Sequence, residues 1–270
     1  MAVTSFASAD SGTVLFAGTL GGGVYRTTNE GVDAFSINSG LSNLLVLSLA
    51  STGHEVFAGT RGAGIFFSSD LGTSWSPVNA GITTDTIQAL FAAGNLLFAG
   101  TDGEGVLCSA DSGLNWNPRN YGLTSFSVLS FAKSGTILLA GTTVGVFSSS
   151  DSGTTWQPAG PTAVSVFTLA VAGNTVFAGT GGNGVYVSTN GGLSWTPEGP
   201  TSAYVQALAI SGNNLFAGTA NGILFSTDEG ANWKSVNTGF VVNALWVDQT
   251  HLFAGTQGNG VWYMSLTDLP

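Results

Sequence analysis

Hydrophobic residues along the chain occur in short runs, which are separated by glycine, asparagine, aspartate, serine or proline. The runs are rich in Val, Leu, Phe and Thr, which favour strands, and the separating residues favour turns. No stretch places apolar residues at the 3.6-residue spacing of an amphipathic helix with a charged opposite face. The pattern therefore predicts an all-β protein made of many short strands.

The sequence FAGT marks a repeat that runs through the whole chain. Its copies begin at Phe16, Phe57, Phe98, Leu139 (as LAGT), Phe177, Phe216 and Phe253. Successive copies lie 41, 41, 41, 38, 39 and 37 residues apart. A period of about 40 residues is typical of β-propeller blades and of helical arrays. The residue types exclude helices, so the period favours a propeller.

Each repeat contains the same four segments, each of strand length. Examples are IQALFAAG from Ile87, LLFAGT from Leu96, GVYVS from Gly184 and WSPVNAGI from Trp75. Four antiparallel strands per repeat form one blade of a propeller. We therefore predict a single seven-bladed β-propeller domain over residues 1–270, with blades that start near residues 2, 44, 86, 127, 165, 204 and 241.

Two details of the repeat bear on how the ring closes and packs. The fourth segment occurs six times and the others seven, because the chain reads GVWYMSLTDLP from Gly260 onward. We expect a seventh blade of three strands, or an outer strand formed by residues 266–270. The first segment carries only small residues at one position, and we expect this size limit because the inner strands crowd together at the axis. These residues are Ser5, Ser48, Ala89, Ser130, Thr168, Ala207 and Ala244.

An eight-residue motif, S-x-D-x-G-x-x-W, lies between the third and fourth segments. Complete copies begin at Ser68, Ser109, Ser149 and Ser226. The copy at Ser188 has Asn190 for the aspartate, and the copy at Thr27 has Asn29 for the aspartate and Ala34 for the tryptophan. The motif, its place and the period resemble the Asp-box, or BNR repeat, of sialidases, two-propeller xyloglucanases, sortilin-type receptors and many bacterial surface proteins. The resemblance covers nearly the whole chain, and it implies a hairpin turn on the outer part of each blade, away from the active site.

The residue types of the motif also indicate a structural turn. An aspartate can accept hydrogen bonds from its own turn, a glycine can adopt positive φ, and a tryptophan can cover apolar surface between blades. We assign these structural roles to Asp70, Asp111, Asp151, Asn190 and Asp228, and to Trp75, Trp116, Trp156, Trp195 and Trp233. Calcium binding is the alternative, but one carboxylate per motif is far fewer than the roughly six to eight oxygen ligands that calcium takes. We therefore expect neither a metal nor a cofactor.

Charge narrows the range of partners. The chain has 5 lysine and arginine residues against 15 aspartate and glutamate residues, and its formal net charge is −10. This balance excludes nucleic acid, whose phosphates need clustered basic side chains, and it disfavours anionic membranes. No apolar run is long enough to span a bilayer, so no membrane insertion is expected. The lone Cys108 excludes an internal disulfide and a cysteine-based metal site.

The first residues lack the basic region and the uninterrupted apolar core of a secretion signal. The first repeat begins almost at Met1, so we expect a domain cut from a longer precursor, extracellular or at the cell surface, with its leader absent from this chain. A cytoplasmic protein is the alternative. We expect the domain to be a monomer.

Variable loops on a rigid scaffold are a common place for binding residues. If the motif turns lie on one face of the ring, the loops between the second and third segments and the joints between blades lie on the other. Charged and aromatic residues of these loops concentrate in blades 2 and 3, with Phe126 beside them. The candidate ligand-binding residues are Arg61, Asp85, Asp102, Glu104 and Tyr121. Such a group could bind a sugar by hydrogen bonding and stacking. The alternative is that these residues are solvated loop charges with no ligand.

The sequence supports catalysis less well than it supports ligand binding. The resemblance to sialidases implies an arginine triad, but the three arginines of this chain, Arg26, Arg61 and Arg119, lie in three different kinds of segment. A glycoside hydrolase would need two carboxylates, and the available pair is Asp85 with Asp102 or Glu104. His54 and His251 have no serine and aspartate marked out beside them for a triad, and two histidines are too few for zinc.

We therefore interpret the chain as a non-catalytic binding or scaffolding module for a glycan or a partner protein. We expect its site in the central opening or among the loops of blades 2 and 3. A glycoside hydrolase is the first alternative, and a purely structural surface or assembly domain is the second.

Overall fold

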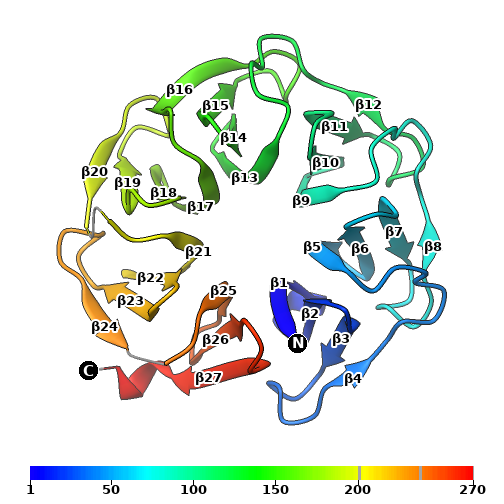
Figure 1. The fold of residues 1–270 in the computed structure, drawn as a ribbon, viewed down its shortest axis with the longest axis horizontal. Helices are drawn as coiled ribbons and strands as arrows, with labels where there is room; N and C mark the ends of the chain where they lie inside the picture. The colour runs from blue at the N-terminus through cyan, green and yellow to red at the C-terminus, as the bar shows by residue number, and fades with distance from the viewer. Residues whose placement is uncertain (200–201, 237–238, 270) are drawn as a thin grey trace.

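The computed structural model describes residues 1–199, 202–236 and 239–269. In these residues six sheets of four strands and one sheet of three strands surround a central opening (Figure 1). The strands of each sheet follow one another in sequence order, and neighbouring strands pair antiparallel. The predicted seven-bladed β-propeller with a three-stranded last blade is therefore confirmed.

Each sheet is one blade, and its strands run from the central opening outward. Blade 1 contains β1 (Ala2–Ala9), β2 (Val14–Leu20), β3 (Gly23–Thr27) and β4 (Phe35–Ser36). Blade 2 contains β5 (Val46–Thr52), β6 (Glu55–Thr60), β7 (Ile65–Ser68) and β8 (Ser76–Pro77). Blade 3 contains β9 (Ile87–Ala93), β10 (Leu96–Thr101), β11 (Val106–Ser109) and β12 (Asn117–Pro118).

The second half of the ring repeats this order. Blade 4 contains β13 (Val128–Ser134), β14 (Ile137–Thr142), β15 (Gly145–Ser149) and β16 (Gln157–Thr162). Blade 5 contains β17 (Val166–Ala172), β18 (Thr175–Thr180), β19 (Val185–Ser188) and β20 (Thr196–Glu198). Blade 6 contains β21 (Val205–Ser211), β22 (Asn214–Thr219), β23 (Gly222–Ser226) and β24 (Lys234–Val236). Blade 7 contains β25 (Val242–Val247), β26 (His251–Thr256) and β27 (Val261–Ser265).

The outer strand that residues 266–270 could have supplied to blade 7 is not formed in the described part of this segment. Residues Leu266–Asp268 form a 3-10 helix, η2, and Pro270 lies outside the described residues. A second 3-10 helix, η1 (Asp10–Gly12), lies in the hairpin between β1 and β2.

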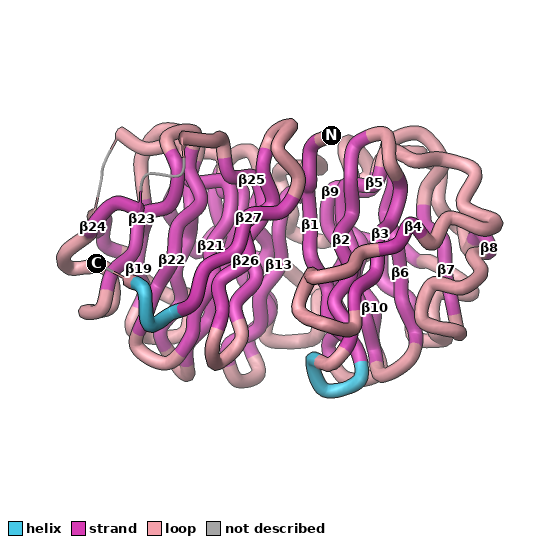
Figure 2. Tube along the Cα trace, turned by 90° about the horizontal axis from the view of Figure 1, so that it is seen from below, coloured by secondary structure: helices cyan, strands magenta, loops and turns pink. Residues whose placement is uncertain are grey.

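The two faces of the ring carry different connections (Figure 2). The hairpins between first and second strands lie on one face, where η1 is seen, and the chain enters β1 at the other. Because the strands are antiparallel, the motif turns share the face of these hairpins. We call this the motif face. The loops between second and third strands and the joints between blades lie on the opposite face, which we call the loop face.

The small residues of the inner strands are explained by contact between blades. Ser48 pairs with Gly59 of the next strand, and a Cβ atom on Gly59 would lie 2.8 Å from Cγ2 of Ile87 in blade 3. A glycine and a small residue thus let a branched side chain of the following blade come close. The small position therefore packs against β9, the inner strand of the next blade, whose Ile87 carbonyl accepts from the Ser48 hydroxyl (3.4 Å). This contact agrees with the crowding of inner strands expected from the sequence.

Candidate functional site

The motif turns use their own polar groups. In the copy from Ser149, the Ser149 hydroxyl donates to Asp151 Oδ1 (2.8 Å) and accepts from the Gly153 N–H (2.8 Å). Asp151 Oδ1 also accepts from the Thr155 N–H (2.8 Å), and Oδ2 accepts from the Thr155 hydroxyl (2.7 Å). Both carboxylate oxygens are therefore engaged inside the turn, as they are at Asp70, Asp111 and Asp228.

Two successive left-handed residues shape each motif turn. In this copy Ser152 has φ 57° and Gly153 has φ 80°. The glycine was expected at such a position because it adopts positive φ without steric cost. The second left-handed residue, just before the glycine, was not expected, since Leu71, Ser112, Ser152 and Glu229 carry side chains that disfavour it.

Hydrogen bonding within the turns shifts the acidity of their aspartates. Bonds from the side chain and the N–H of Ser74, together with the Ser68 hydroxyl, lower the pKa of Asp70 from 3.8 to about 2. Equivalent bonds from the residue four positions on lower the pKa of Asp111 and of Asp151 to about 2, and they also lower the pKa of Asp228. The charged carboxylate is thus the form that the folded turn stabilises.

These lowered pKa values predict a pH-dependent stability. Because the folded pKa lies below that of the unfolded chain, the stabilisation is present above about pH 4 and is lost as the pH falls toward 2. We expect the double variant Asp70→Asn/Asp151→Asn to lose less stability than the wild type over this range. Urea unfolding at several pH values between 5 and 2 measures the difference.

The chain itself supplies the control for this experiment. Asn190 makes the same turn, with its amide Nδ2 donating to the Ser194 hydroxyl (2.8 Å). The hydroxyls of Ser74 and Thr155 can likewise reverse to accept from an asparagine amide. Asn190→Asp should therefore steepen the acid dependence. Equal slopes for the wild type and the double variant would contradict the assignment.

The motif tryptophans join neighbouring blades in two ways. Trp116 is buried, its Nε1 donates to the Val78 carbonyl of blade 2 (3.0 Å), and its N–H donates to the Ala80 carbonyl (2.8 Å). Trp75 and Trp156 make the same two kinds of contact with blades 1 and 3. The indoles of Trp195 and Trp233 instead donate to their own turns, and these two side chains are only half-buried.

On the loop face, asparagine side chains hold the joints that follow blades 1, 2 and 3 against the loops of the same blades. Oδ1 of Asn79 accepts from the Ile65 N–H (2.7 Å), and its Nδ2 donates to the Ala63 carbonyl (3.1 Å). Asn38 and Asn120 make the equivalent pairs of bonds in blades 1 and 3. Sequence reasoning missed this device, although NSGL, NAGI and NYGL recur at 41-residue spacing from positions 38, 79 and 120.

The threonine of each FAGT repeat holds the loops of the same face. In every blade its buried or nearly buried hydroxyl donates to the carbonyl of the glycine that ends the following loop, over 2.8–2.9 Å. These residues are Thr19, Thr60, Thr101, Thr142, Thr180, Thr219 and Thr256. On the loop face, each loop between a second and a third strand is therefore short, and a hydrogen bond joins its first residue to its last.

The carboxylates predicted as a binding group are engaged separately. Glu104 accepts from the N–H (3.1 Å) and hydroxyl (2.8 Å) of Thr83 and from the Thr84 N–H (3.0 Å), so it ties the joint after blade 2 to the loop of blade 3. Asp102 Oδ1 accepts from the Ser127 hydroxyl (3.2 Å).

The side chains of the other three predicted residues make no bond to one another in the described part of the chain, although the backbone of Arg61 pairs with Thr86, next to Asp85. Asp85 is exposed, and its carbonyl accepts from two N–H groups of the loop that follows Arg61. Tyr121 is 79% exposed in the joint after blade 3, where its carbonyl accepts from the Trp156 N–H. Of the five residues, Arg61 alone lines the central opening in the described part of the chain.

The central opening is hollowed into a cavity of ≈ 670 Å³. The residue just before the small position of each inner strand contributes to its wall, so every blade supplies one side chain. These are Thr4, Leu47, Gln88, Leu129, Phe167, Gln206 and Asn243, and Ala2, Leu20, Arg61, Tyr204 and Gln257 complete the lining. Among the described residues, the wall combines amides, aromatic rings and aliphatic groups with one cation, Arg61, and with no carboxylate side chain.

Several polar groups of the opening are uncommitted. Among the described residues, the Arg61 guanidinium and the side-chain amides of Gln88, Gln206 and Gln257 make no hydrogen bond or ion pair. Sequence reasoning named the opening but missed these amides. For Gln88 and Gln206 the signal was present as a polar residue inside an otherwise apolar strand, in IQALFAA and VQALAIS.

Each of the two histidines lies near one acidic residue. His54 Nδ1 lies 3.0 Å from Asp10, and His251 Nδ1 lies 3.6 Å from Glu30. Across the described residues, no group of three or more His, Cys, Asp or Glu side chains is placed to hold a metal ion. In the same residues, no helix has the length and apolar character needed to cross a membrane.

Comparison with known proteins establishes the fold. A family model described as "DUF6242 beta propeller domain" matches residues 127–260, and no curated protein matches the sequence. Among solved structures, YCF48 bound to D1 peptide is 16% identical with a TM-score of 0.76, and the match covers 99% of this chain and 94% of that one.

Two further neighbours are longer proteins. The GH74 xyloglucanase from Xanthomonas campestris is 14% identical with a TM-score of 0.79, and the match covers 100% of this chain and 52% of the enzyme. An extracellular domain of a one-component system from B. thetaiotaomicron is 16% identical with a TM-score of 0.75, and the match covers 97% of this chain. This chain spans 38% of that extracellular domain and about half of the xyloglucanase. At these identities the likeness is one of fold.

Proposed function

We propose that the chain is a non-catalytic binding module of the Asp-box (BNR) type, which recognises a segment of a partner protein in the central opening. The proposal rests chiefly on one observation, the uncommitted Arg61 guanidinium and glutamine amides that line a cavity of ≈ 670 Å³. Cavities of this size with a few polar groups among apolar ones are typical ligand sites. The short, tethered loops support it, because a rigid site loses little entropy on binding.

The chemistry of the wall suits a peptide that carries a carboxylate. Arg61 can bind a side-chain or C-terminal carboxylate with two parallel hydrogen bonds. The amides of Gln88 and Gln206 can donate to and accept from peptide groups. The rings of Phe167 and Tyr204 offer apolar surface beside them. The peptide would thus make one charged contact, with Arg61, and neutral contacts with the amides and rings of the wall.

The positions of the carboxylates support a non-catalytic role. A glycosidase needs an acid and a base or nucleophile on either side of the bond that it cleaves. Glu104 accepts three hydrogen bonds from the joint beside it, and Asp102 is bonded to Ser127. Neither residue lines the central opening, and neither does Asp85.

A protein ligand has better support than a glycan. YCF48, of whose own chain the match covers 94%, was solved bound to D1 peptide. The xyloglucanase, whose name indicates a glycan substrate, is about twice as long as this chain. A glycan stacked on Tyr204 remains the alternative ligand.

Binding experiments on the wild type and matched variants test the proposal. We expect acid-containing peptides to be selected from a peptide array, and Arg61→Ala to weaken their binding by about tenfold or more. Arg61→Lys should restore it in part, since lysine keeps the charge but loses the planar fork. Asp85→Asn, on the same face, serves as the control and should leave binding unchanged.

Other outcomes would overturn the proposal. Selective binding on a glycan array without peptide binding would make the opening a lectin site, and release of sugar from any bound glycan would make the protein an enzyme. If neither array gives a ligand that depends on Arg61, the domain has a structural or assembly role.

We also propose an extracellular location. The likeness to extracellular domains of B. thetaiotaomicron supports it, as does the resemblance of the motif to repeats of surface proteins. Labelling of intact source cells with a membrane-impermeant reagent tests this location, and recovery of the unlabelled protein in the cytosol would contradict it.

A further inference from the structure

The ring closes where blade 7 meets blade 1, and we call this interface the seam. On its inner side the seam resembles the other interfaces. Ala2 pairs with Gln257, and the Asn243 amide donates to the Val3 carbonyl (3.4 Å). On its outer side, β27 is the last strand of its sheet in the described part of the chain, and a gap separates it from β3 and β4 (Figure 1).

The difference between the seam and the other interfaces is seen in the exposure of one residue that recurs in every blade. The first branched residue of each third strand is at most 1% exposed in six blades, at Val24, Ile65, Val106, Val146, Val185 and Ile223. In blade 7 the equivalent Val261 is 42% exposed, and Tyr263, on the same side of the strand, is 57% exposed. The position that is core everywhere else is therefore open at the seam.

Two departures from the repeat coincide there. In blades 1 to 5 the branched residue shares a core with the outer segment of its own blade and with the motif tryptophan of the next, as Ile65 does with Val78 and Trp116. In blade 6, which precedes a blade without the motif, Ile223 shares its core with Val236, Leu266 and Leu269 instead. At the seam, blade 7 has no outer strand among the described residues, and the motif of blade 1 has Ala34 in place of the tryptophan. Both covering elements are thus missing at one interface.

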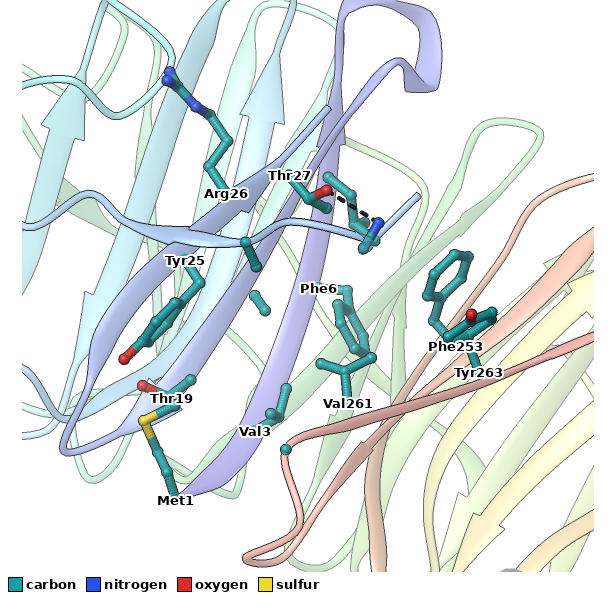
Figure 3. A pocket seen from close by; sticks show the side chains of 15 residues that line it. Met1, Val3, Phe6, Thr19, Tyr25, Arg26, Thr27, Phe253, Val261 and Tyr263 are labelled. Carbon is teal, nitrogen blue, oxygen red and sulfur yellow. Dashed lines mark hydrogen bonds between the residues drawn. The ribbon is translucent and has the colours of Figure 1, made fainter. Parts of the chain in front are cut away.

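A mainly apolar cavity of ≈ 310 Å³ occupies this place. Figure 3 shows Val261, Tyr263 and Phe253 of blade 7 on one side and Tyr25 and Phe6 of blade 1 on the other. Ala34 also lines the cavity. Its volume and lining suit a bulky apolar side chain.

The backbone of β27 offers matching hydrogen-bonding groups. In blade 2 the Ile65 carbonyl accepts from the Val78 N–H (2.9 Å), and the Ile65 N–H donates to Asn79 (2.7 Å). Val261 occupies the equivalent position, opposite Gly255 as Ile65 is opposite Gly59. Its N–H and carbonyl therefore face outward, where no described residue pairs with them.

The C-terminal segment of the chain runs to the opposite side of blade 7. The Leu266 N–H donates to the Thr250 carbonyl (2.8 Å), and Leu266 and Leu269 pack against the core between blades 6 and 7. The end of the described chain lies beside blade 6 (Figure 1). This segment therefore leaves the outer edge of β27 uncovered.

Charge at the seam favours a basic occupant. Glu30 and Asp33 lie in the motif turn of blade 1, beside Gly31 and Ala34 of the cavity lining. The Glu30 side chain is 66% exposed, with one carboxylate oxygen 3.6 Å from Nδ1 of His251 in blade 7. Arg26, which also lines the cavity, donates to the Leu71 carbonyl of blade 2 (2.9 Å). The net charge of −10 acts in the same direction.

We propose that the seam is a strand-addition site for an extended segment of a partner protein. The segment pairs antiparallel with β27, as outer strands do in the other six blades, and so completes the seventh sheet. A bulky apolar side chain enters the cavity beside Ala34. Because an antiparallel strand begins at the motif face, basic residues at its N-terminal end lie near Glu30 and Asp33. This site is separate from the central opening and does not depend on the function proposed for it.

The outer segment of blade 2 provides the probe. Residues 76–82 read SPVNAGI, where the valine packs toward the next blade and the asparagine bonds the third strand. We would synthesise KKSPWNAGI, in which tryptophan replaces that valine and two lysines precede the segment. KKSPANAGI removes the bulky side chain, and EESPWNAGI reverses the charge. Isothermal titration calorimetry with the full chain measures binding.

The proposal predicts a defined set of results. KKSPWNAGI binds the wild type, and the two comparison peptides bind at least about tenfold more weakly. Val261→Pro removes the outward N–H, a change that an edge strand tolerates, and weakens binding by about tenfold or more. Ala34→Trp fills the cavity and has the same effect. Val261→Thr keeps the N–H and retains binding, and Arg61→Ala leaves binding unchanged.

Three results would overturn the proposal. The first is no binding of KKSPWNAGI at about 1 mM. The second is binding that is unaffected in both Val261→Pro and Ala34→Trp, with thermal melting curves showing that each variant is folded. The third is a wild-type dimer, seen by light scattering, that Val261→Pro converts to a monomer, because a second copy of the chain would then be the occupant.

Discussion

Replacing Trp116 by alanine is expected to lower the free energy of unfolding by roughly 2–4 kcal/mol. The side chain is 2% exposed, and it packs against Ile65 and Val78 of the preceding blade. Its removal leaves a cavity between two blades. It also leaves the Val78 carbonyl without the hydrogen bond that the indole donates. The same change at half-buried Trp195 should cost clearly less, since that indole bonds its own turn. Urea unfolding followed by fluorescence and circular dichroism measures both.

Phenylalanine separates packing from hydrogen bonding at this site. Trp116→Phe keeps most of the apolar contact and loses the bond to Val78, so we expect it to cost about 1 kcal/mol. A ranking in which Trp195→Ala equals or exceeds Trp116→Ala would refute the distinction between the two groups of tryptophans. Loss of ligand binding with an unchanged unfolding curve would refute the structural role of the motif.

Replacing Asn79 by alanine is expected to cost about 2–3 kcal/mol. The side chain satisfies the Ile65 N–H and the Ala63 carbonyl at once, and alanine leaves both without that partner. Because Ile65 is part of the core between blades 2 and 3, its unpaired N–H would be shielded from water. Chemical denaturation measures the loss of stability.

Two variants sharpen the result for Asn79. Asn79→Asp keeps an acceptor for the Ile65 N–H but cannot donate to Ala63, so its stability should fall between those of the wild type and the alanine variant. Asn174→Ala is the matched control, because this exposed asparagine makes a single bond to the Thr189 carbonyl (3.2 Å) and should cost under about 0.5 kcal/mol. A cost at Asn79 as small as at Asn174 would show that the joint is not held by this side chain.

The fold was predictable because the same constraint recurs in each repeat. The spacing of the FAGT copies defines the blades, and the structure shows why the glycine and the threonine recur in each copy. Its glycine admits a branched residue such as Ile87 from the next blade, and its threonine holds a loop. The absence of a seventh copy of the fourth segment likewise predicted a three-stranded blade. A local pattern was sufficient wherever the contact lies within one blade or between successive blades.

The outer strands were harder to predict. WSPVNAGI reads as one strand, yet β8 spans only Ser76–Pro77. Beyond Val78 the chain is held by the Asn79 side chain and by bonds to the next blade, as the Trp116 N–H donates to Ala80. Propensity describes a segment as a strand or a turn, and it carries no information on such side-chain pairing.

The candidate sites depended on contacts that a sequence does not display. Glu104 and Asp102 appeared to be available charges, and their partners Thr83 and Ser127 become visible only when neighbouring blades are placed side by side. The uncommitted amide of Gln88 became significant only when seven inner strands were brought around one axis. The cavity at the seam required the first and last repeats to meet, which no pattern within a single repeat can indicate.

The wall of the central opening has a consequence for protein engineering. Each blade presents one side chain from the same register position, and at five of the seven positions this side chain makes no hydrogen bond to a neighbouring blade in the described part of the chain. A combinatorial library at positions 47, 88, 129, 167 and 206 would therefore vary the recognition chemistry of most of the wall, while Thr4 and Asn243 keep their hydrogen bonds to the next blade. The propeller thus separates the residues that determine selectivity from those that maintain its architecture.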